Sequence, residues 1–154
     1  MSSIRIAKAS RKWSFDRQLG AIVSVMVRRG AYARDMAAEI NNLRPAILHE
    51  QVYFFFDAYQ RVCGYAAWAM LAPDVEQRIE SKQTLLLHES EWNEGGNFWI
   101  VAFGSASRRT ADLIRHLKAE VLPRHGELRF LRHRMNGRRG VVRIVRQSSR
   151  TPSA

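Results

Sequence analysis

Residues 97–123, NFWIVAFGSASRRTADLIRHLKAEVLP, contain the pattern that decides the fold. The apolar run over residues 98–103 predicts a strand, and the small residues after it predict a tight turn. From Arg108 onward, apolar residues recur at helical spacing, which predicts an amphipathic helix that ends before Pro123. Mixed folds usually bind their ligands where a strand passes through a turn into a helix.

The predicted turn has the composition of an anion-binding site. A helix N-terminus leaves about four backbone N–H groups without intrahelical acceptors and carries a partial positive charge. An ordinary strand–helix connection capped by a serine has the same composition, and the turn matches no P-loop or dinucleotide-binding fingerprint. Both interpretations are open, and the first predicts a phosphate bound at Gly104, Ser105, Ala106, Ser107, Arg108 and Arg109.

The chain before this stretch predicts two helices and a hairpin. Ser14 is a suitable N-cap for the first helix and Gly30 ends it. The second helix covers residues 33–47, and Pro45 should break or tighten its last turn. Two β-rich runs, residues 51–56 and 62–70, follow, with DAYQ between them as the connection.

The remaining elements are a short helix and a second hairpin. Pro73 is favoured at the first position of a helix, so the short helix begins there. Two alternating runs, residues 127–134 and 140–146, form a C-terminal hairpin. The order of elements predicts an α+β fold, an α/β sandwich in which helices cover a mixed, mostly antiparallel sheet.

Length and composition favour one soluble domain. The 154 residues suit a single core, and we expect a domain over residues 13–146 between a flexible basic lead-in, residues 1–12, and a disordered polar tail, residues 147–154. No apolar run approaches the roughly 20 residues of a membrane span, and no signal peptide is recognisable. The single cysteine, Cys63, excludes an internal disulfide. These features favour a cytoplasmic location.

The positive charge lies mainly in the last third of the chain. The formal net charge is +11, and residues 108–150 hold 12 arginines and one lysine against three acidic residues, which gives +10 for that segment alone. Such a field attracts acidic partners. Nucleic acid, an anionic membrane surface and an acidic carrier protein all qualify, and composition does not choose between them.

Several motifs, taken in order, resemble those of the toxin-activating lysine acyltransferases, the hemolysin-activator family that fatty-acylates RTX toxins. The resemblance covers residues 13–146 and rests on order and spacing, because each motif is weak alone. The motifs are LGAI at 19–22, PAI at 45–47, GYAAWA at 64–69, WNEGGNFW at 92–99, AFG at 102–104 and LRHRMNGRRGVVR at 131–143.

The resemblance implies a fold like that of the GNAT N-acetyltransferases and an acyl transfer to a lysine. Members take a fatty acyl group from acyl-acyl carrier protein and place it on a lysine ε-amine of a protoxin. The donor is then the acyl-phosphopantetheine of an acidic carrier protein, or acyl-CoA, with no tightly bound cofactor. In GNAT-like folds the turn that corresponds to residues 104–109 receives the pantetheine phosphate, and the acyl chain would lie against the strands at 62–70 and 98–103.

The sequence departs from the family at both catalytic positions. The position of the family's histidine falls on Tyr32. The position of its aspartate falls on Ala102 when aligned forward from Trp92, and on Phe98 when aligned back from the AFG motif. Tyr32 is therefore the candidate catalytic residue, as a general acid for the departing thiolate; the alternative is that it caps a helix junction.

Other chemistry-bearing residues have structural interpretations. His49 and His88 are alternative bases or surface histidines, and His116, His125 and His133 belong to the basic face. Cys63, inside an apolar strand, is expected to be a buried inert thiol. No group of residues has metal-ligand spacing, so no metal site is expected.

Three further interpretations stay open beside the leading one. The chain is a non-catalytic member that binds or regulates, an acyltransferase for a small-molecule amine, or a nucleic-acid-binding domain. The last ranks lowest because the sequence shows no RNA-reading aromatic signature and no helix-turn-helix. A homodimer is compatible with each of them.

Overall fold

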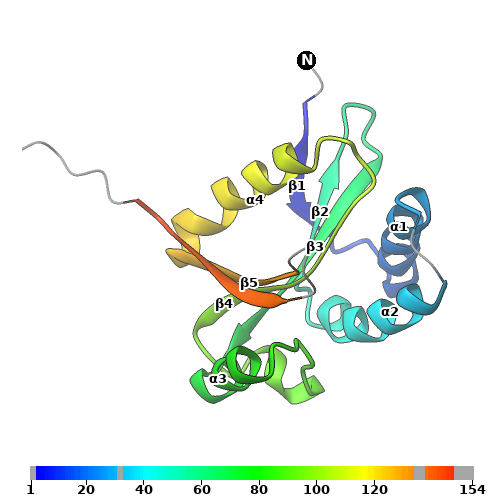
Figure 1. Ribbon diagram of the computed structural model, residues 1–154. Coiled ribbons are helices and arrows are strands. Elements are labelled where there is room, and N and C mark those ends of the chain that lie inside the picture. The colour runs from blue at the N-terminus through cyan, green and yellow to red at the C-terminus, as the bar shows by residue number, and fades with distance from the viewer. Residues whose placement is uncertain (1–2, 31–32, 134–137, 148–154) are drawn as a thin grey trace, which may run out of the picture.

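The computed structural model describes residues 3–30, 33–133 and 138–147. In these ranges six strands form one sheet in the order β1-β2-β3-β4-β5-β6 (Figure 1). Neighbouring strands are antiparallel except β4 and β5, which are parallel. The strands are β1 (Arg5–Lys8), β2 (Val52–Phe56), β3 (Val62–Leu71), β4 (Asn97–Ser105), β5 (Glu127–His133) and β6 (Arg139–Val145).

Helices cover both faces of the sheet, so the predicted α+β sandwich is confirmed. The helices α1 (Phe15–Arg28), α2 (Ala33–Leu48) and α3 (Pro73–Lys82), with the 3-10 helix η1 (Glu89–Trp92), pack on one face. The helix α4 (Thr110–His125) packs on the other (Figure 1). The arrangement of four helices and a six-stranded mixed sheet in the described residues is consistent with a GNAT-like fold.

The strands β2 and β3 are apolar on both sides because helices cover both sides. Every residue of β2 is buried, and Phe54 packs in the core under α1 and α2 while Phe55 packs in the core under α4. In β3, Tyr65 belongs to the first core and Ala66 to the second. Such strands appear in a sequence as continuous apolar runs rather than alternating ones.

Several local predictions are confirmed. Ser14 is the N-cap of α1, and its hydroxyl accepts the backbone N–H of Arg17 at 3.1 Å. Pro73 begins α3, as its missing N–H favours. The strand–turn–helix over residues 97–123 is present as β4, a short turn and α4.

The helix α4 extends past the proline that was expected to lie beyond its end, whereas α2 contains its proline near its end, as the sequence predicted. Pro45 lies inside α2 and Pro123 inside α4. Each proline removes a single hydrogen bond in the last turn, and packing of the buried residues Ile47 and Val121 holds that turn on the sheet. The end of α4 is set instead by Gly126, whose φ of 73° lies in the left-handed region and whose N–H donates to Leu122 O at 2.8 Å.

The predicted flexible lead-in contains a strand that the sequence did not reveal. Residues Arg5–Lys8 pair with β2, and Ile4 is buried beside Phe55 in the core under α4. Two adjacent apolar residues between two charged ones give too short a pattern to predict a strand. The exposed edge of β2 supplies the hydrogen-bond partners that order this segment.

Candidate functional site

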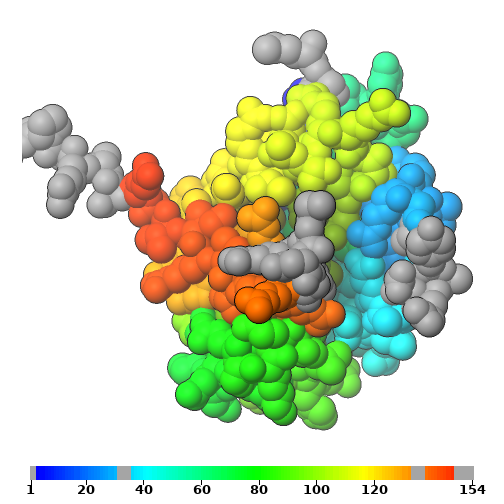
Figure 2. All heavy atoms as spheres, viewed as in Figure 1, coloured from blue at the N-terminus to red at the C-terminus, as the bar shows by residue number. Residues whose placement is uncertain are grey.

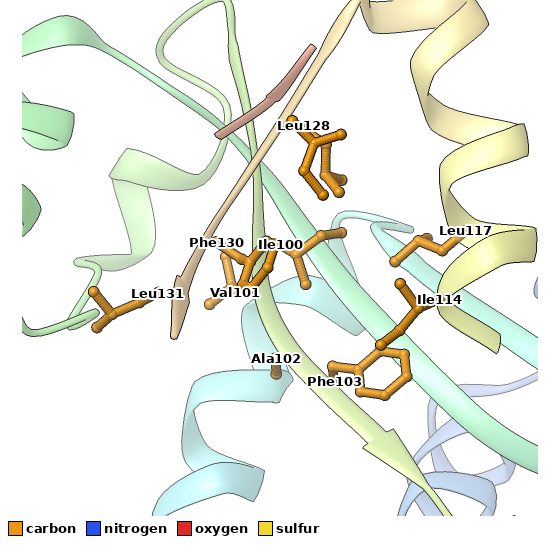
Figure 3. A pocket seen from close by; sticks show the side chains of 10 residues that line it. Ile100, Val101, Ala102, Phe103, Ile114, Leu117, Leu128, Phe130 and Leu131 are labelled. Atoms are coloured by element: carbon orange, nitrogen blue, oxygen red, sulfur yellow. The ribbon is translucent and has the colours of Figure 1, made fainter. Parts of the chain in front are cut away.

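A pocket of ≈ 180 Å³ lies between β4, β5, β6 and α4 (Figure 3). All of the residues that line it are apolar. On β4 they begin at Ile100 and end at Phe103, one residue before the predicted phosphate site. The lining residues are Ile100, Val101, Ala102, Phe103, Ile114, Leu117, Leu128, Phe130, Leu131 and Ile144.

The pocket exists because β4 and β5 separate. The two strands are in register only at Trp99↔Arg129 and Ile100↔Phe130. On the other side of β4, the register with β3 shifts, so that Ala67 faces Ala102 and Trp68 faces Ile100. Val101 is therefore the extra residue of a β-bulge, and a bulge bends its strand and ends regular pairing. The bulge lies where β4 leaves β5 and where the pocket begins.

The turn after β4 is held by its own serines. The backbone N–H of Ser107 donates to Ser105 Oγ at 3.2 Å, and the N–H of Arg109 donates to Ser107 Oγ at 3.0 Å. The N–H of Ala106 donates to the carbonyl of Cys63 on β3 at 2.9 Å. These bonds fix the turn but use backbone donors that a bound phosphate would otherwise receive.

Other donors of the turn are open to a ligand. Arg109 is the N-cap of α4 and gives no side-chain cap. Within the described part of the chain, the backbone N–H groups of Arg108, Thr110 and Ala111 have no protein acceptor, and Arg108 is exposed. The turn thus offers the N-terminus of a long helix together with an exposed guanidinium, which suits an anion.

An acidic residue limits the positive charge at this helix start. Asp112, in the first turn of α4, forms ion pairs with Arg109 and Arg115. Its carboxylate already interacts with the helix dipole, so part of the field that favours a phosphate is neutralised.

Gly104 lies near the end of β4, not in the turn, and a glycine is required there for packing. A Cβ on this residue would overlap the ring of Tyr65 on β3. The hydroxyl of Tyr65 donates to Glu39 on α2, and the other oxygen of Glu39 accepts from Arg29 at 2.6 Å. Burial first, and then the hydrogen bond and charge of Glu39, raise the pKa of Tyr65, so this phenol stays a donor.

The three positions predicted from the family's catalytic pair have different outcomes. Tyr32 lies outside the described residues. Phe98 is buried and stacks on His125 at 4.4 Å and on Trp68 at 5.4 Å between ring centroids. Ala102 lines the pocket. Neither Phe98 nor Ala102 brings a titratable group to the site.

The alternative bases lie on other parts of the surface. His49 is exposed beyond the end of α2, and His88 is the N-cap of η1, where its Nδ1 accepts the backbone N–H of Ser90 at 3.3 Å. Cys63 is buried, and burial raises the pKa of its thiol, as expected for an inert cysteine. His125 packs on Phe98. The side chain of His133 lies outside the described part of the structure.

Some arginines of the C-terminal hairpin form ion pairs, and several are exposed on the surface. Arg129 contacts Glu76 at 2.8 Å and Glu127 at 2.6 Å, and Arg143 also pairs with Glu127. Figure 2 shows the surface of the hairpin between those of α4 and α3. Exposed arginines of the hairpin and of the start of α4 include Arg108, Arg115, Arg132, Arg139, Arg143 and Arg146.

The sequence did not reveal the pocket or the Arg29–Glu39–Tyr65 group. Both depend on the strand register, and the hydrophobic residues of the pocket have the same spacing as an ordinary core. The predicted acyl contact with β4 agrees with the lining, whereas β3 contributes no lining residue and β5, β6 and α4 form the other walls.

Comparison with protein-family models places the chain beside a known family. Residues 11–146 match the sequence model of the RTX toxin acyltransferase family. No curated protein matches the chain. Among the described residues, no helix has the length and apolar character needed to cross a membrane.

Proposed function

The chain belongs to the RTX toxin acyltransferase family, and from that premise we propose that it transfers an acyl group from a thioester donor to an amine. The donor is the acyl-phosphopantetheine of acyl carrier protein, or acyl-CoA. The acceptor is a lysine ε-amine of a protein, such as an RTX protoxin.

The observation that carries this proposal is the position of the apolar pocket beside the turn. Phe103 and Ile114 both line the pocket, and the turn joins the elements on which they lie. A phosphate at Arg108 and at the N–H groups of Thr110 and Ala111 would place the arm attached to it at the mouth of the pocket. A charged head group and an apolar tail are the two parts of an acyl-phosphopantetheine.

The transfer requires one bond to form and one to break. The acceptor nitrogen attacks the thioester carbonyl carbon, the C–N bond forms, the C–S bond breaks, and the nitrogen loses a proton while the thiolate gains one. An ε-ammonium has a pKa of about 10.4 in water, so it must first be deprotonated. A placed base contributes about 10²- to 10⁴-fold, and orientation of the reactants can contribute more.

The proton donor proposed for the thiolate is Tyr32, the residue at the family's histidine position. Phe98 and Ala102 supply no acid or base. Orientation by the pocket and the turn therefore carries a larger share of the rate than in a member with the full catalytic pair.

An acidic carrier protein would dock on the exposed arginines named above. Arg108 lies in the turn itself and Arg115 on α4, while the other four lie on β5 and β6 or directly after β6, beside the pocket. Charge of one sign around a site raises the association rate of an oppositely charged partner and makes it sensitive to salt.

Intact-mass analysis tests the proposal. The protein is incubated with acyl carrier protein that bears different acyl groups and with candidate acceptor proteins or small amines. An increase in mass equal to one acyl group on an acceptor lysine supports the proposal. The same increase on a small amine would show that the acceptor is a small molecule instead of a protein. No transfer with any donor, combined with retained donor binding, would identify a non-catalytic binding protein instead.

A further inference from the structure

The pocket is small for a fatty acyl chain, and we propose that the protein selects short acyl groups of about six carbons. This inference rests on the proposed function and names its substrate class. The pocket has a volume of ≈ 180 Å³. A cavity of about 150 Å³ in another protein holds one benzene molecule, which has six carbon atoms. By this comparison the pocket holds about six or seven non-hydrogen atoms.

The residues that line the pocket differ in their exposure. Leu117 and Leu128 are 4% and 2% exposed, whereas Ile114, one turn earlier on α4, is 38% exposed. Figure 3 shows Ile114 and Phe103 together, away from Leu128. The pairing of β4 with β5 at Ile100↔Phe130 closes the gap between the strands. A chain that enters beside Phe103 would therefore meet the buried side chains of Leu117 and Leu128.

The depth of the pocket agrees with its volume. Its lining on β4 extends from Phe103 to Ile100. At about 3.3 Å per residue, three residues span about 10 Å. A long fatty acyl chain would leave most of its methylenes in water or would have to displace the hairpin residues Leu131 and Ile144.

The lining also specifies the chemistry of the occupant. All ten lining residues are apolar, so an alkyl chain gains from entering and a hydroxylated or charged chain does not. Each buried methylene should strengthen binding by about fourfold. Affinity should therefore rise with chain length until the pocket is full and then stop rising.

A series of donors tests this inference with the full-length protein. Acyl carrier protein is loaded with acetyl, butyryl, hexanoyl, octanoyl, dodecanoyl or hexadecanoyl groups, and each affinity is measured by calorimetry relative to the unacylated carrier. This ratio removes the contribution of carrier docking. Affinity should rise from acetyl to hexanoyl or octanoyl and should not rise further with dodecanoyl or hexadecanoyl. A rise that continues to hexadecanoyl, or no dependence on length, would overturn the inference while leaving the proposed function intact. No binding of any donor would overturn both.

Two variants of the pocket should move the optimum in opposite directions. Ile144→Ala deletes three side-chain carbons from the wall and should shift the optimum to chains about two or three carbons longer. Ala102→Leu fills part of the pocket. This variant should bind the acetyl carrier as the parent does but should show no increase in affinity from the butyryl to the hexanoyl carrier. Val145→Ala, on the same strand at a residue that is 53% exposed, is the matched control. An unchanged optimum in both pocket variants, with thermal unfolding showing that they fold, would contradict the assignment.

Discussion

The ring of Tyr65 occupies the space into which a side chain on Gly104 would extend. The two residues face each other in the register of β3 and β4, and the hydroxyl of Tyr65 donates to Glu39 on α2. The last part of β4, where the predicted phosphate site begins, is thereby fixed to β3 and α2. The position of the turn depends on this contact.

Gly104→Ala should destabilise the protein. The added methyl group must displace the buried ring of Tyr65, and overpacking of this kind costs about 1–3 kcal/mol. Urea unfolding measures the change. Gly20→Ala is the control, because no atom lies within 4 Å of its Cβ position and it lies inside α1, where alanine is favoured by about 0.5–1 kcal/mol. Equal stability of Gly104→Ala and the parent protein would contradict the contact.

Tyr65 should make the protein less stable at high pH. Its pKa is raised in the folded state by burial and by Glu39, whereas an unfolded tyrosine ionises at about pH 10. The protonated phenol therefore contributes stability that is fully present below about pH 10 and is lost as the pH rises toward the folded-state pKa.

The comparison of two tyrosine variants isolates this effect. Tyr65→Phe should lose less stability above pH 10 than the parent, measured by thermal unfolding across that range. Tyr59→Phe, at a residue that is 80% exposed, should follow the parent curve. Parallel curves for all three proteins would refute the role of Tyr65.

Glu91 should make the protein sensitive to acid. Two hydrogen bonds from Arg78, at 2.6 and 2.7 Å, and one from the N–H of His88 hold its carboxylate. The side-chain hydrogen bond from Arg78 is the main cause that lowers the pKa of Glu91 to about 2. Its contribution to stability is present above the unfolded-state pKa of about 4.3 and is lost as the pH falls toward 2.

Glu91→Gln should therefore be less stable than the parent protein near neutral pH. In a pH series of unfolding measurements, its stability should fall less steeply than that of the parent as the pH falls below about 4.3. Glu89→Gln is the matched control, because Glu89 is 61% exposed and lies 3.7 Å from its partner Arg44. If the two variants behave alike, the Arg78–Glu91 pair is not a source of acid sensitivity.

Arg108→Ala should weaken donor binding without changing stability. An exposed guanidinium that binds a phosphate contributes about 1.5 kcal/mol, or roughly tenfold in affinity. The measurement is the dissociation constant for coenzyme A at several salt concentrations. Arg44→Ala, whose arginine is 61% exposed on α2, should leave that constant unchanged. An equal effect of the two substitutions would indicate general attraction by positive charge.

The sequence predicted the elements that local patterns determine. The apolar run of β4 and the helical spacing of α4 placed the strand and helix around the turn, and Ser14 marked the start of α1. Pro123 misled because tertiary packing outweighs a single lost hydrogen bond. The strand at Arg5–Lys8 was missed because its order comes from the edge of β2.

The pocket was beyond the reach of local patterns. It depends on the bulge at Val101 and on the separation of β4 from β5, which follow from pairing between distant strands. The Tyr65–Glu39 contact likewise joins residues far apart in the sequence. The turn was found because its composition differs from its surroundings, whereas the pocket residues have the composition of any core.

The most direct test of the account is a two-dimensional NMR titration of the protein with hexanoyl-coenzyme A. The account predicts saturable shifts of the backbone amides of Arg108, Thr110 and Ala111, together with the methyl groups of Ile114, Leu117 and Leu128. Saturable binding that shifts signals elsewhere and leaves both groups unchanged would contradict it.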